Sequence, residues 1–183
     1  CIQNKTLYED KNRNCVFVGY DSHNNPRYAN IRSTNTNSSF KGDVKGSDKV
    51  FSFCIKGSSD IVYVFESPIE VLSYLTLLRQ SSIDNFNHHL ISLGGVSNRA
   101  LAQYLKDNPA IRKIALCLNN DNAGIEATKN IGQGYKERYS IINKYPTNKD
   151  FNEDLLSVKN NELFSRERIL TRSSSEEKFN LEL

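Results

Sequence analysis

Hydrophobic and polar residues follow different patterns on the two sides of residue 60. Before it, short runs rich in aromatic and β-branched residues cover 15–20, 27–32 and 50–55, and turn-forming residues fill 21–26. Runs of this kind, bounded by turn formers, are typical of strands joined in hairpins. The polar stretch 33–49 is rich in Ser, Thr, Asn and Gly and predicts an exposed, mobile loop. The first third of the chain therefore predicts a small antiparallel β module.

From residue 61 onward, apolar runs that are typical of buried strands alternate with segments of helical spacing. Strands and helices that alternate along a chain predict a parallel sheet flanked by helices, and hence an α/β fold. The expected strands cover 61–65, 89–93, 113–118 and 139–142, and the expected helices cover 67–79, 97–106, 124–138 and a segment that begins near Phe151.

The first of these helices has the clearest start signal. Ser67 suits the N-cap, Pro68 suits the first helical position, and Glu70 lies three residues after Ser67. This spacing predicts a capping box, in which each of the Ser67 and Glu70 side chains binds the backbone N–H of the other residue.

Length and charge indicate how the chain is divided. It has 183 residues, 38% of them hydrophobic, and a net charge of +3, which is typical of a globular protein. We expect a small basic β-rich module at 1–59, the α/β domain at 60–157 and a charged C-terminal tail at 158–183. Residues 1–60 hold nine basic and six acidic residues, so the whole positive surplus lies there. Such a surface is compatible with nucleic acid, although many surfaces of this size carry a similar surplus by chance.

Several features that the chain lacks narrow the class of protein. No apolar stretch reaches the roughly 18–20 residues of a membrane span, and no signal peptide is recognisable, so we expect no membrane partner. The chain contains no Met, which indicates a piece of a longer protein whose other domains are partners. Its four cysteines have no zinc-ligand spacing, and three lie in apolar runs, which favours reduced thiols and a cytoplasmic location.

Acidic and amide side chains lie where the expected parallel strands end. Glu66 follows the first strand, Asn119 and Asp121 follow the third, and Asp150 precedes the last helix. Because ligands of open parallel sheets bind at the carboxyl ends of the strands, we expect these side chains to converge, with Glu70 one helical turn beyond Glu66. Clustered oxygen ligands suit Mg²⁺, or Mn²⁺ in its place, and such an ion organises displacement at phosphorus.

Each of these residues also has a purely structural alternative. Glu66 could be an exposed loop residue, and Glu70 could serve only in the capping box. Asp121 and Asp150 could each be the N-cap of the helix that follows. Their matching positions along the chain favour a shared site over separate structural roles.

Three segments resemble the signatures of the Toprim domain, the catalytic fold of bacterial primases, topoisomerases and related nucleases. They are Phe65–Glu70, Ser92–Gly95 and Leu118–Gly124. In that family a Glu follows the first strand, a Gly follows the second, and Asp-x-Asp with a later Ala-Gly follows the third. The segment Lys149–Leu156 is similar to the closing Lys-Asp segment of the family.

The front third carries a second resemblance, in Val18–Asp21, Arg27–Ala29 and Gly46–Lys49. These segments look like the uncharacterised module that precedes Toprim in primase-like and relaxase-associated proteins of plasmids and conjugative elements. Together the resemblances imply a DNA-binding protein with Mg²⁺-dependent chemistry on DNA or RNA phosphodiesters. That chemistry would be primase-like nucleotidyl transfer or nicking, in DNA replication or in mobilisation of a mobile element.

The resemblance also implies the roles of the site residues. Glu66, Glu70 and Asp121 are the expected catalytic residues, and Glu66, Asn119, Asp121 and Asp150 are the expected metal ligands. One position departs from the family, because Asn119 stands where its first Asp of Asp-x-Asp is expected. The missing negative charge lowers the expected metal affinity.

This departure keeps two alternatives open. The first is a Toprim fold that has lost its chemistry and binds nucleic acid or scaffolds a larger protein. The second is an unrelated α/β fold with carboxylates at its strand ends by chance. The neighbouring His88 and His89 are a less informative feature, and we expect them to form a solvated pair at a loop end.

Overall fold

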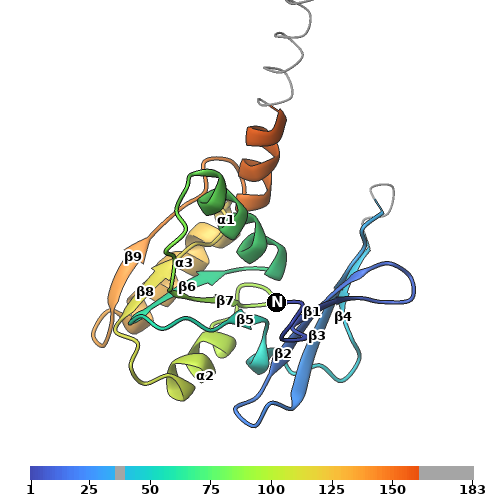
Figure 1. Ribbon diagram of the computed structural model, residues 1–183. Coiled ribbons are helices and arrows are strands. Elements are labelled where there is room, and N and C mark those ends of the chain that lie inside the picture. Colours follow the sequence, from blue (N-terminus) through green and yellow to red (C-terminus); the bar gives the residue numbers. More distant parts are fainter. Residues whose placement is uncertain (36–39, 161–183) are drawn as a thin grey trace, which may run out of the picture.

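Two β-sheets lie side by side in the computed structural model, which describes residues 1–35 and 40–160 (Figure 1). One sheet is antiparallel and comes first in the chain; the other is mostly parallel and is flanked by helices. The expected α/β fold, preceded by a small antiparallel module, is therefore confirmed.

The antiparallel sheet contains, in spatial order, β1 (Leu7–Glu9), β2 (Cys15–Tyr20), β3 (Pro26–Arg32) and β4 (Lys41–Asp43). Its first two hairpins close in the same way. The carboxylates of Asp10 and Asp21 each accept hydrogen bonds from the backbone N–H groups two and four residues later. Since short acidic and amide side chains stabilise tight turns by such local bonds, the repeated Asp-x-x-x-Asn pattern fixes both turns.

The sequence does not predict β1 or β4, and it predicts one strand wrongly. Residues 50–55 are not a continuous strand, because a 3₁₀ turn, η1 (Lys49–Phe51), comes before the short strand β5 (Cys54–Ile55). Asp48 explains the difference, since its carboxylate accepts a hydrogen bond from the Val50 N–H and starts the turn.

The parallel sheet has the strand order β5-β7-β6-β8-β9, in which only β5 runs antiparallel to its neighbour. All the elements expected after residue 60 are present. They are β6 (Ile61–Phe65), α1 (Pro68–Gln80), β7 (His89–Ser92), α2 (Arg99–Asp107), β8 (Lys113–Leu116), α3 (Asn122–Tyr135), β9 (Ser140–Asn143) and a helical segment at 151–160.

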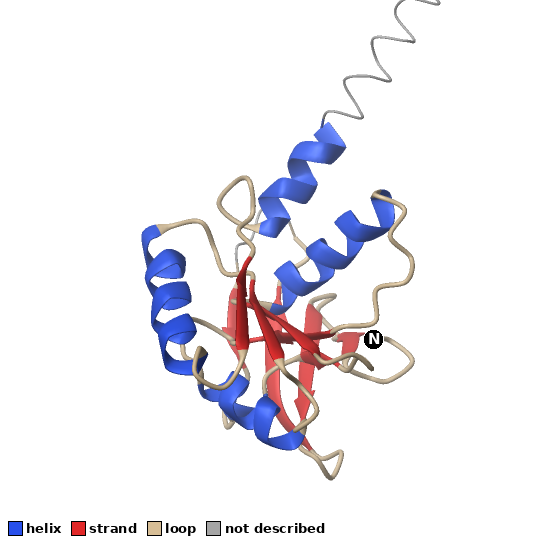
Figure 2. Cartoon of the chain, turned by 90° about the vertical axis from the view of Figure 1, so that its left-hand side faces the viewer, coloured by secondary structure: helices blue, strands red, loops and turns tan. Residues whose placement is uncertain are grey.

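Helices cover both faces of this sheet (Figure 2). Helix α1 and Phe151 of the last segment pack on one face, whereas α2 and α3 pack on the other. The chain therefore leaves β6 toward one face and leaves its neighbour β8 toward the opposite face. In open α/β sheets, a crevice for ligands forms at the carboxyl ends of two such strands.

The two sheets are joined by close packing between β2 and the segment that follows η1. The Phe17 ring meets the Phe53 ring edge-on at 5.4 Å, and both residues are fully buried. A Cβ atom at Gly19 would overlap the Phe51 carbonyl oxygen, so only glycine permits this approach. β5 lies within 1–59, the range expected for the first module, yet it pairs with β7 of the parallel sheet. The expected domain boundary between residues 59 and 60 stays a prediction. Most of the expected C-terminal tail, 161–183, lies outside the described residues.

The expectation of a solvated His88–His89 pair is wrong. His89 is 6% exposed, and its Nε2 lies 3.1 Å from the Ser59 carbonyl oxygen, to which it can only donate. Its Nδ1 therefore accepts from the Tyr104 hydroxyl at 2.8 Å, and burial lowers the pKa of the ring. His88 is half-buried and bonds the Ser59 hydroxyl. His89 thus holds the start of β7 against α2, whereas His88 bonds the segment before β6.

Candidate functional site

The carboxyl ends of β6, β7 and β8 lie nearly level, because Phe65 pairs with Ser92 and Val64 pairs with Leu116, the last residue of β8. The residues that follow these strands therefore meet at one edge of the sheet. The Glu66 Oε1 atom accepts a hydrogen bond from the Asn119 N–H at 3.1 Å. The Glu66 carbonyl oxygen accepts from the Gly95 N–H at 3.0 Å. Glu66 thus joins the loops that follow all three strands.

Glu66 itself is half-buried among charged groups. Burial raises the pKa of its carboxyl, and the Asn119 N–H opposes this rise. The carboxylates of Asp121 and Asp150 raise the pKa further, whereas the Lys149 ammonium lowers it. Negative charges are therefore crowded at this edge, and a cation placed among them would be stabilised.

Glu70 lies in the first turn of α1 and is 4% exposed. The predicted capping box is wrong, because the Ser67 hydroxyl donates to the Glu70 Oε1 atom at 2.6 Å and makes no cap bond to the backbone. The other carboxyl oxygen, Oε2, has no hydrogen-bond partner among the described residues. Burial raises the pKa of this carboxyl to about 7. Glu70 is thus a group that gains or loses a proton near neutral pH.

The loop between β8 and α3 is folded tightly around Asn119. A Cβ atom at Gly124 would overlap the Asn119 carbonyl oxygen, which explains the glycine at that position. The Asn119 Oδ1 atom is buried, and no described residue gives it a hydrogen bond. Since buried polar atoms are rarely left without a partner, this oxygen is available to a ligand from outside the chain.

Asp121 and Asp150 do serve as N-caps. The Asp121 Oδ1 atom accepts from the Gly124 N–H at 3.0 Å, and the Asp150 Oδ1 atom accepts from the Glu153 N–H at 2.8 Å. The structural alternative is therefore real for both residues. An N-cap uses one carboxylate oxygen, and the second keeps its full capacity for a ligand. In Asp121 that second oxygen lies 3.8 Å from the Lys149 ammonium.

A cavity of about 390 Å³ opens at this edge, between the two sheets. Four of the five predicted site residues line it, namely Glu66, Glu70, Asn119 and Asp150. Asp121 does not line it and acts there through its charge on Glu66. Among residues 1–35 and 40–160, no group of three or more His, Cys, Asp or Glu is arranged to hold a metal.

The donors at this edge nevertheless fit a small, hard cation in their chemistry. They are all oxygens, and the buried Oδ1 of Asn119 has no partner within residues 1–35 and 40–160. Mg²⁺ prefers oxygen ligands, and one or two carboxylates together with substrate phosphates suffice to bind it.

The antiparallel module supplies part of the cavity wall, which the sequence does not predict. Asp43 is the centre of this part, since its carboxylate accepts from the Tyr28 hydroxyl at 2.8 Å and from the Asn30 side chain at 2.9 Å. The Lys49 ammonium lies 2.9 Å from the same carboxylate and donates to the Gly94 carbonyl oxygen at 3.0 Å. Arg32 and Lys41 are the other basic residues that this module contributes to the lining. The only sequence signal for this contact is the Gly46–Lys49 motif.

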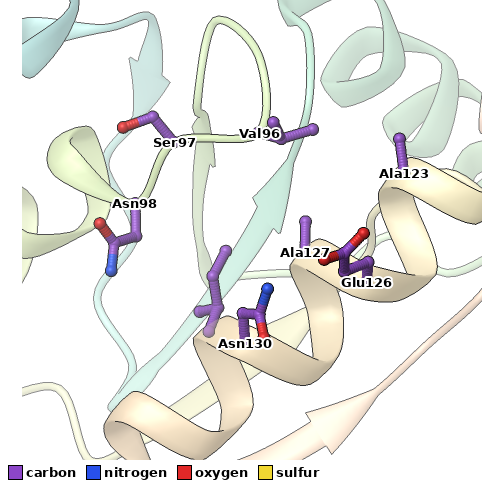
Figure 3. Close-up of a pocket in the computed structure, with 8 residues that line it drawn as sticks. Val96, Ser97, Asn98, Ala123, Glu126, Ala127 and Asn130 are labelled. Carbon is purple, nitrogen blue, oxygen red and sulfur yellow. The ribbon is translucent and has the colours of Figure 1, made fainter.

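A second cavity, of about 480 Å³, lies between α3 and the loop that leads into α2 (Figure 3). Val96 and Ser97 line it from the loop, and Ala127 and Asn130 line it from α3. Glu126 is its only charged lining residue among those that the structure describes. None of the predicted site residues reaches it, so the acidic site belongs to the first cavity.

The model of the Toprim-like family matches residues 63–155, which are 93 of the 183 residues. The chain belongs to the Toprim-like family. The matched range includes all five predicted site residues. Residues 1–59 match a second family, described as a protein of unknown function (DUF3991). This Toprim-like chain therefore carries an uncharacterised module in front of its family domain, as its sequence predicts.

Several solved structures of primases have a similar fold. The primase fragment of the bacteriophage T7 primase-helicase has a TM-score of 0.63 at 15% identity, over 89% of this chain and 67% of that one. The DnaG catalytic core has a TM-score of 0.56 at 12% identity, over 85% of this chain and 54% of that one. A primase domain from Pseudomonas aeruginosa has a TM-score of 0.51 at 14% identity, over 83% and 52%. The Toprim-like chain thus has a primase-like fold and spans about half the length of the last two chains.

No curated protein matches the chain in sequence. In the part of the chain that the structure describes, no helix is both long and apolar enough to cross a membrane. All four cysteines lie in that part and are free thiols.

Proposed function

We propose that this chain carries out Mg²⁺-dependent, primase-like nucleotidyl transfer on a nucleic-acid template, as one part of a longer replication or mobilisation protein. The observation that carries the proposal is the meeting of Glu66, Glu70, Asn119 and Asp150 in one cavity whose opposite wall is basic. Acidic groups suit a metal ion, and basic groups suit the phosphates that such an ion would act on.

Three lining residues, Glu66, Asn119 and Asp150, would hold the ion, and the Asp121 carboxylate would add negative charge beside Glu66. When bound, Mg²⁺ polarises the phosphoryl group and neutralises charge that develops during the displacement. The residues fit this task because Asn119 offers a buried oxygen that no described residue bonds, and the carboxylates crowd negative charge around Glu66. Mn²⁺ has the same preference for oxygen ligands and would serve in its place.

The chain's own residues would handle the proton. In nucleotidyl transfer, the oxygen of a 3′ hydroxyl forms a bond to the α-phosphorus, the bond from that phosphorus to pyrophosphate breaks, and the hydroxyl proton must leave. Glu66 or Glu70 would accept it. Glu70 is suited to this role because the pKa of its carboxyl is about 7, and a base with a pKa near the working pH is the most effective.

Basic residues on the opposite wall would bind the strand. Arg32 and Lys41 lie on β3 and β4 and line the cavity across from Glu66. Cationic side chains that contact phosphates bind nucleic acid whatever its nucleotide sequence, and this affinity falls as the salt concentration rises. The antiparallel module would thus hold nucleic acid while the Toprim-like domain reacts with it.

The test is incorporation of labelled nucleotides on single-stranded DNA and RNA by the full chain with Mg²⁺ or Mn²⁺. Glu66→Gln removes a carboxylate at nearly constant volume, and we expect a loss of about a hundredfold or more. Glu137→Gln, at an exposed position in the turn after α3, is the matched control and should keep full activity. Equal activity of wild type and Glu66→Gln would overturn the proposal. Nicking of a supercoiled plasmid in parallel distinguishes strand cleavage from synthesis.

A second function is favoured by Asn119 and by the N-cap bonds of Asp121 and Asp150. In this alternative the chain binds nucleic acid without chemistry and helps to assemble a larger protein. Its signature would be DNA affinity that falls steeply with salt and is unchanged in Glu66→Gln, with no incorporation at any metal concentration.

A further inference from the structure

Lys49 connects the two sheets at the edge of the acidic site. Its ammonium lies 2.9 Å from the Asp43 carboxylate and donates to the Gly94 carbonyl oxygen at 3.0 Å. Asp43 is held in turn by the hydroxyl of Tyr28 and the amide of Asn30. The Asp43 side chain is 26% exposed and has three donors; burial raises the pKa of its carboxyl, but the bonds from Asn30, Lys49 and Tyr28 outweigh this and lower it. The ammonium therefore has a fixed anchor on one side and the Gly94 carbonyl on the other.

The segment that carries Lys49 is itself tightly fixed to β3. The Ser47 hydroxyl accepts from the Ala29 N–H at 3.0 Å and lies 3.2 Å from the Ala29 carbonyl oxygen, to which it donates. The Asp48 N–H donates to the Arg27 carbonyl oxygen at 2.8 Å. Gly46 has a φ of +86°, a conformation that glycine adopts at little cost. Each residue of the Gly46–Lys49 motif thus has a separate role in holding the lysine.

The Gly94–Gly95 turn lies on the other side of the contact with Lys49 and has no side chains of its own to stabilise it. Gly94 and Gly95 have φ values of +65° and +139°, and neither has a side chain to hold it. The Gly95 N–H donates to the Glu66 carbonyl oxygen, so the turn determines how the backbone of the acidic residue is held. A Cβ atom at Gly94 would lie 3.1 Å from the Tyr28 hydroxyl oxygen, which shows how closely the antiparallel module approaches.

We propose that Lys49 is a positioning residue, which holds the Gly94–Gly95 turn in the conformation that supports Glu66. Two of the three N–H donors of its ammonium bond oxygens of the chain, and these bonds fix the ammonium against the turn. The antiparallel module, whose matching family has no assigned function, thereby completes the site of the Toprim-like domain. The effect on activity rests on the proposed function, whereas the effect on the turn does not.

The direct test is amide hydrogen exchange of the full chain, followed over peptides that contain Gly94 and Gly95. In Lys49→Met, which keeps the length of the side chain and removes its charge, we expect exchange of the turn to be about tenfold faster, because a bond to a charged donor is lost. Lys49→Arg should restore most of the protection. Lys45→Met, at an exposed position in the same segment, should change nothing. Unchanged exchange in Lys49→Met, with the rest of the sheet equally protected in all variants, would overturn the proposal.

Kinetics then separate positioning from substrate binding. Loss of a positioning residue should lower kcat about tenfold and leave KM for the nucleotide nearly unchanged, with partial rescue by Lys49→Arg. A rise in KM at constant kcat would mean that Lys49 binds the substrate directly, which contradicts the proposal. If the wild type has no activity at all, the proposed function fails, and the exchange experiment still decides the role of Lys49.

Discussion

Glu70→Gln gives a direct test of the electrostatics of the site, without any assumption about its reaction. Glu70 is 4% exposed, and burial raises the pKa of its carboxyl from an ordinary value of 4.5 to about 7. A rise of one pH unit in a pKa corresponds to about 1.4 kcal/mol, so the ionised carboxylate costs the folded state about 3 kcal/mol. Glutamine has nearly the same shape and cannot ionise, and the variant therefore escapes this cost.

The sign of the effect follows from the protons that each state binds. Below pH 4.5 the carboxyl is protonated in both the folded and the unfolded chain and contributes nothing. Between pH 4.5 and about 7 the unfolded chain has lost the proton while the folded chain keeps it, so the free energy of unfolding falls as the pH rises. Above about pH 7 the full cost remains. The advantage of Glu70→Gln should therefore grow with pH and level off in mildly alkaline solution.

The assay is urea denaturation of wild type and variant in metal-free buffer over a range of pH. Relative to wild type, Glu70→Gln should gain roughly 1 kcal/mol at pH 5 and about 3 kcal/mol at pH 8.5, apart from a constant offset for the altered bond to Ser67. Glu137→Gln, at an exposed position, should show no such trend. A difference between Glu70→Gln and wild type that stays flat from pH 5 to 8.5 would refute the assignment of a protonated buried carboxyl.

Two further substitutions test the loop after β8. Asn119→Asp restores the missing negative charge beside Glu66 and should tighten Mg²⁺ binding about tenfold, measured by calorimetry; unchanged affinity would mean that residue 119 is not a ligand. Gly124→Ala places a methyl group on the Asn119 carbonyl oxygen and should lower the free energy of unfolding by about 1–3 kcal/mol in urea denaturation. A loss well below this would show that the loop shifts easily.

The parallel sheet and its acidic edge could be predicted because they depend on local pattern and on a general rule. Buried strands that alternate with helices determine the class of fold, and the carboxyl ends of parallel strands meet at one edge. Glu66 and Asn119 each directly follow a strand that the sequence predicts, so the sequence predicts that these two residues, 53 positions apart, lie close together. The sequence does not predict that the contact is a hydrogen bond from the Asn119 backbone N–H to the Glu66 carboxylate.

Other features depend on contacts that no local pattern carries. The Ser67–Glu70 spacing fits a capping box. In the folded chain, however, Glu70 is buried and its carboxylate accepts a hydrogen bond directly from the Ser67 hydroxyl. Histidine is a polar residue, and the burial of His89 depends on its bonds to Tyr104 and Ser59, which lie in other segments of the chain. The contact between Lys49 and Gly94 spans 45 residues and joins two sheets, so it appears only once both are folded.

The number of negative charges in the site determines whether Asn119, in place of an Asp, prevents metal binding and catalysis. With Glu70 largely protonated below pH 7, three carboxylates remain, those of Glu66, Asp121 and Asp150, and Lys149 lies close to one of them. Mg²⁺ usually binds proteins through one or two carboxylates together with phosphates of the substrate, and retains several waters. The missing charge of Asn119 therefore weakens binding to the free chain more than binding to its complex with a nucleotide, whose phosphates bring charge of their own. Calorimetry of Mg²⁺ with and without nucleoside triphosphate separates the two functions, since a non-catalytic module would show no coupling between metal and nucleotide.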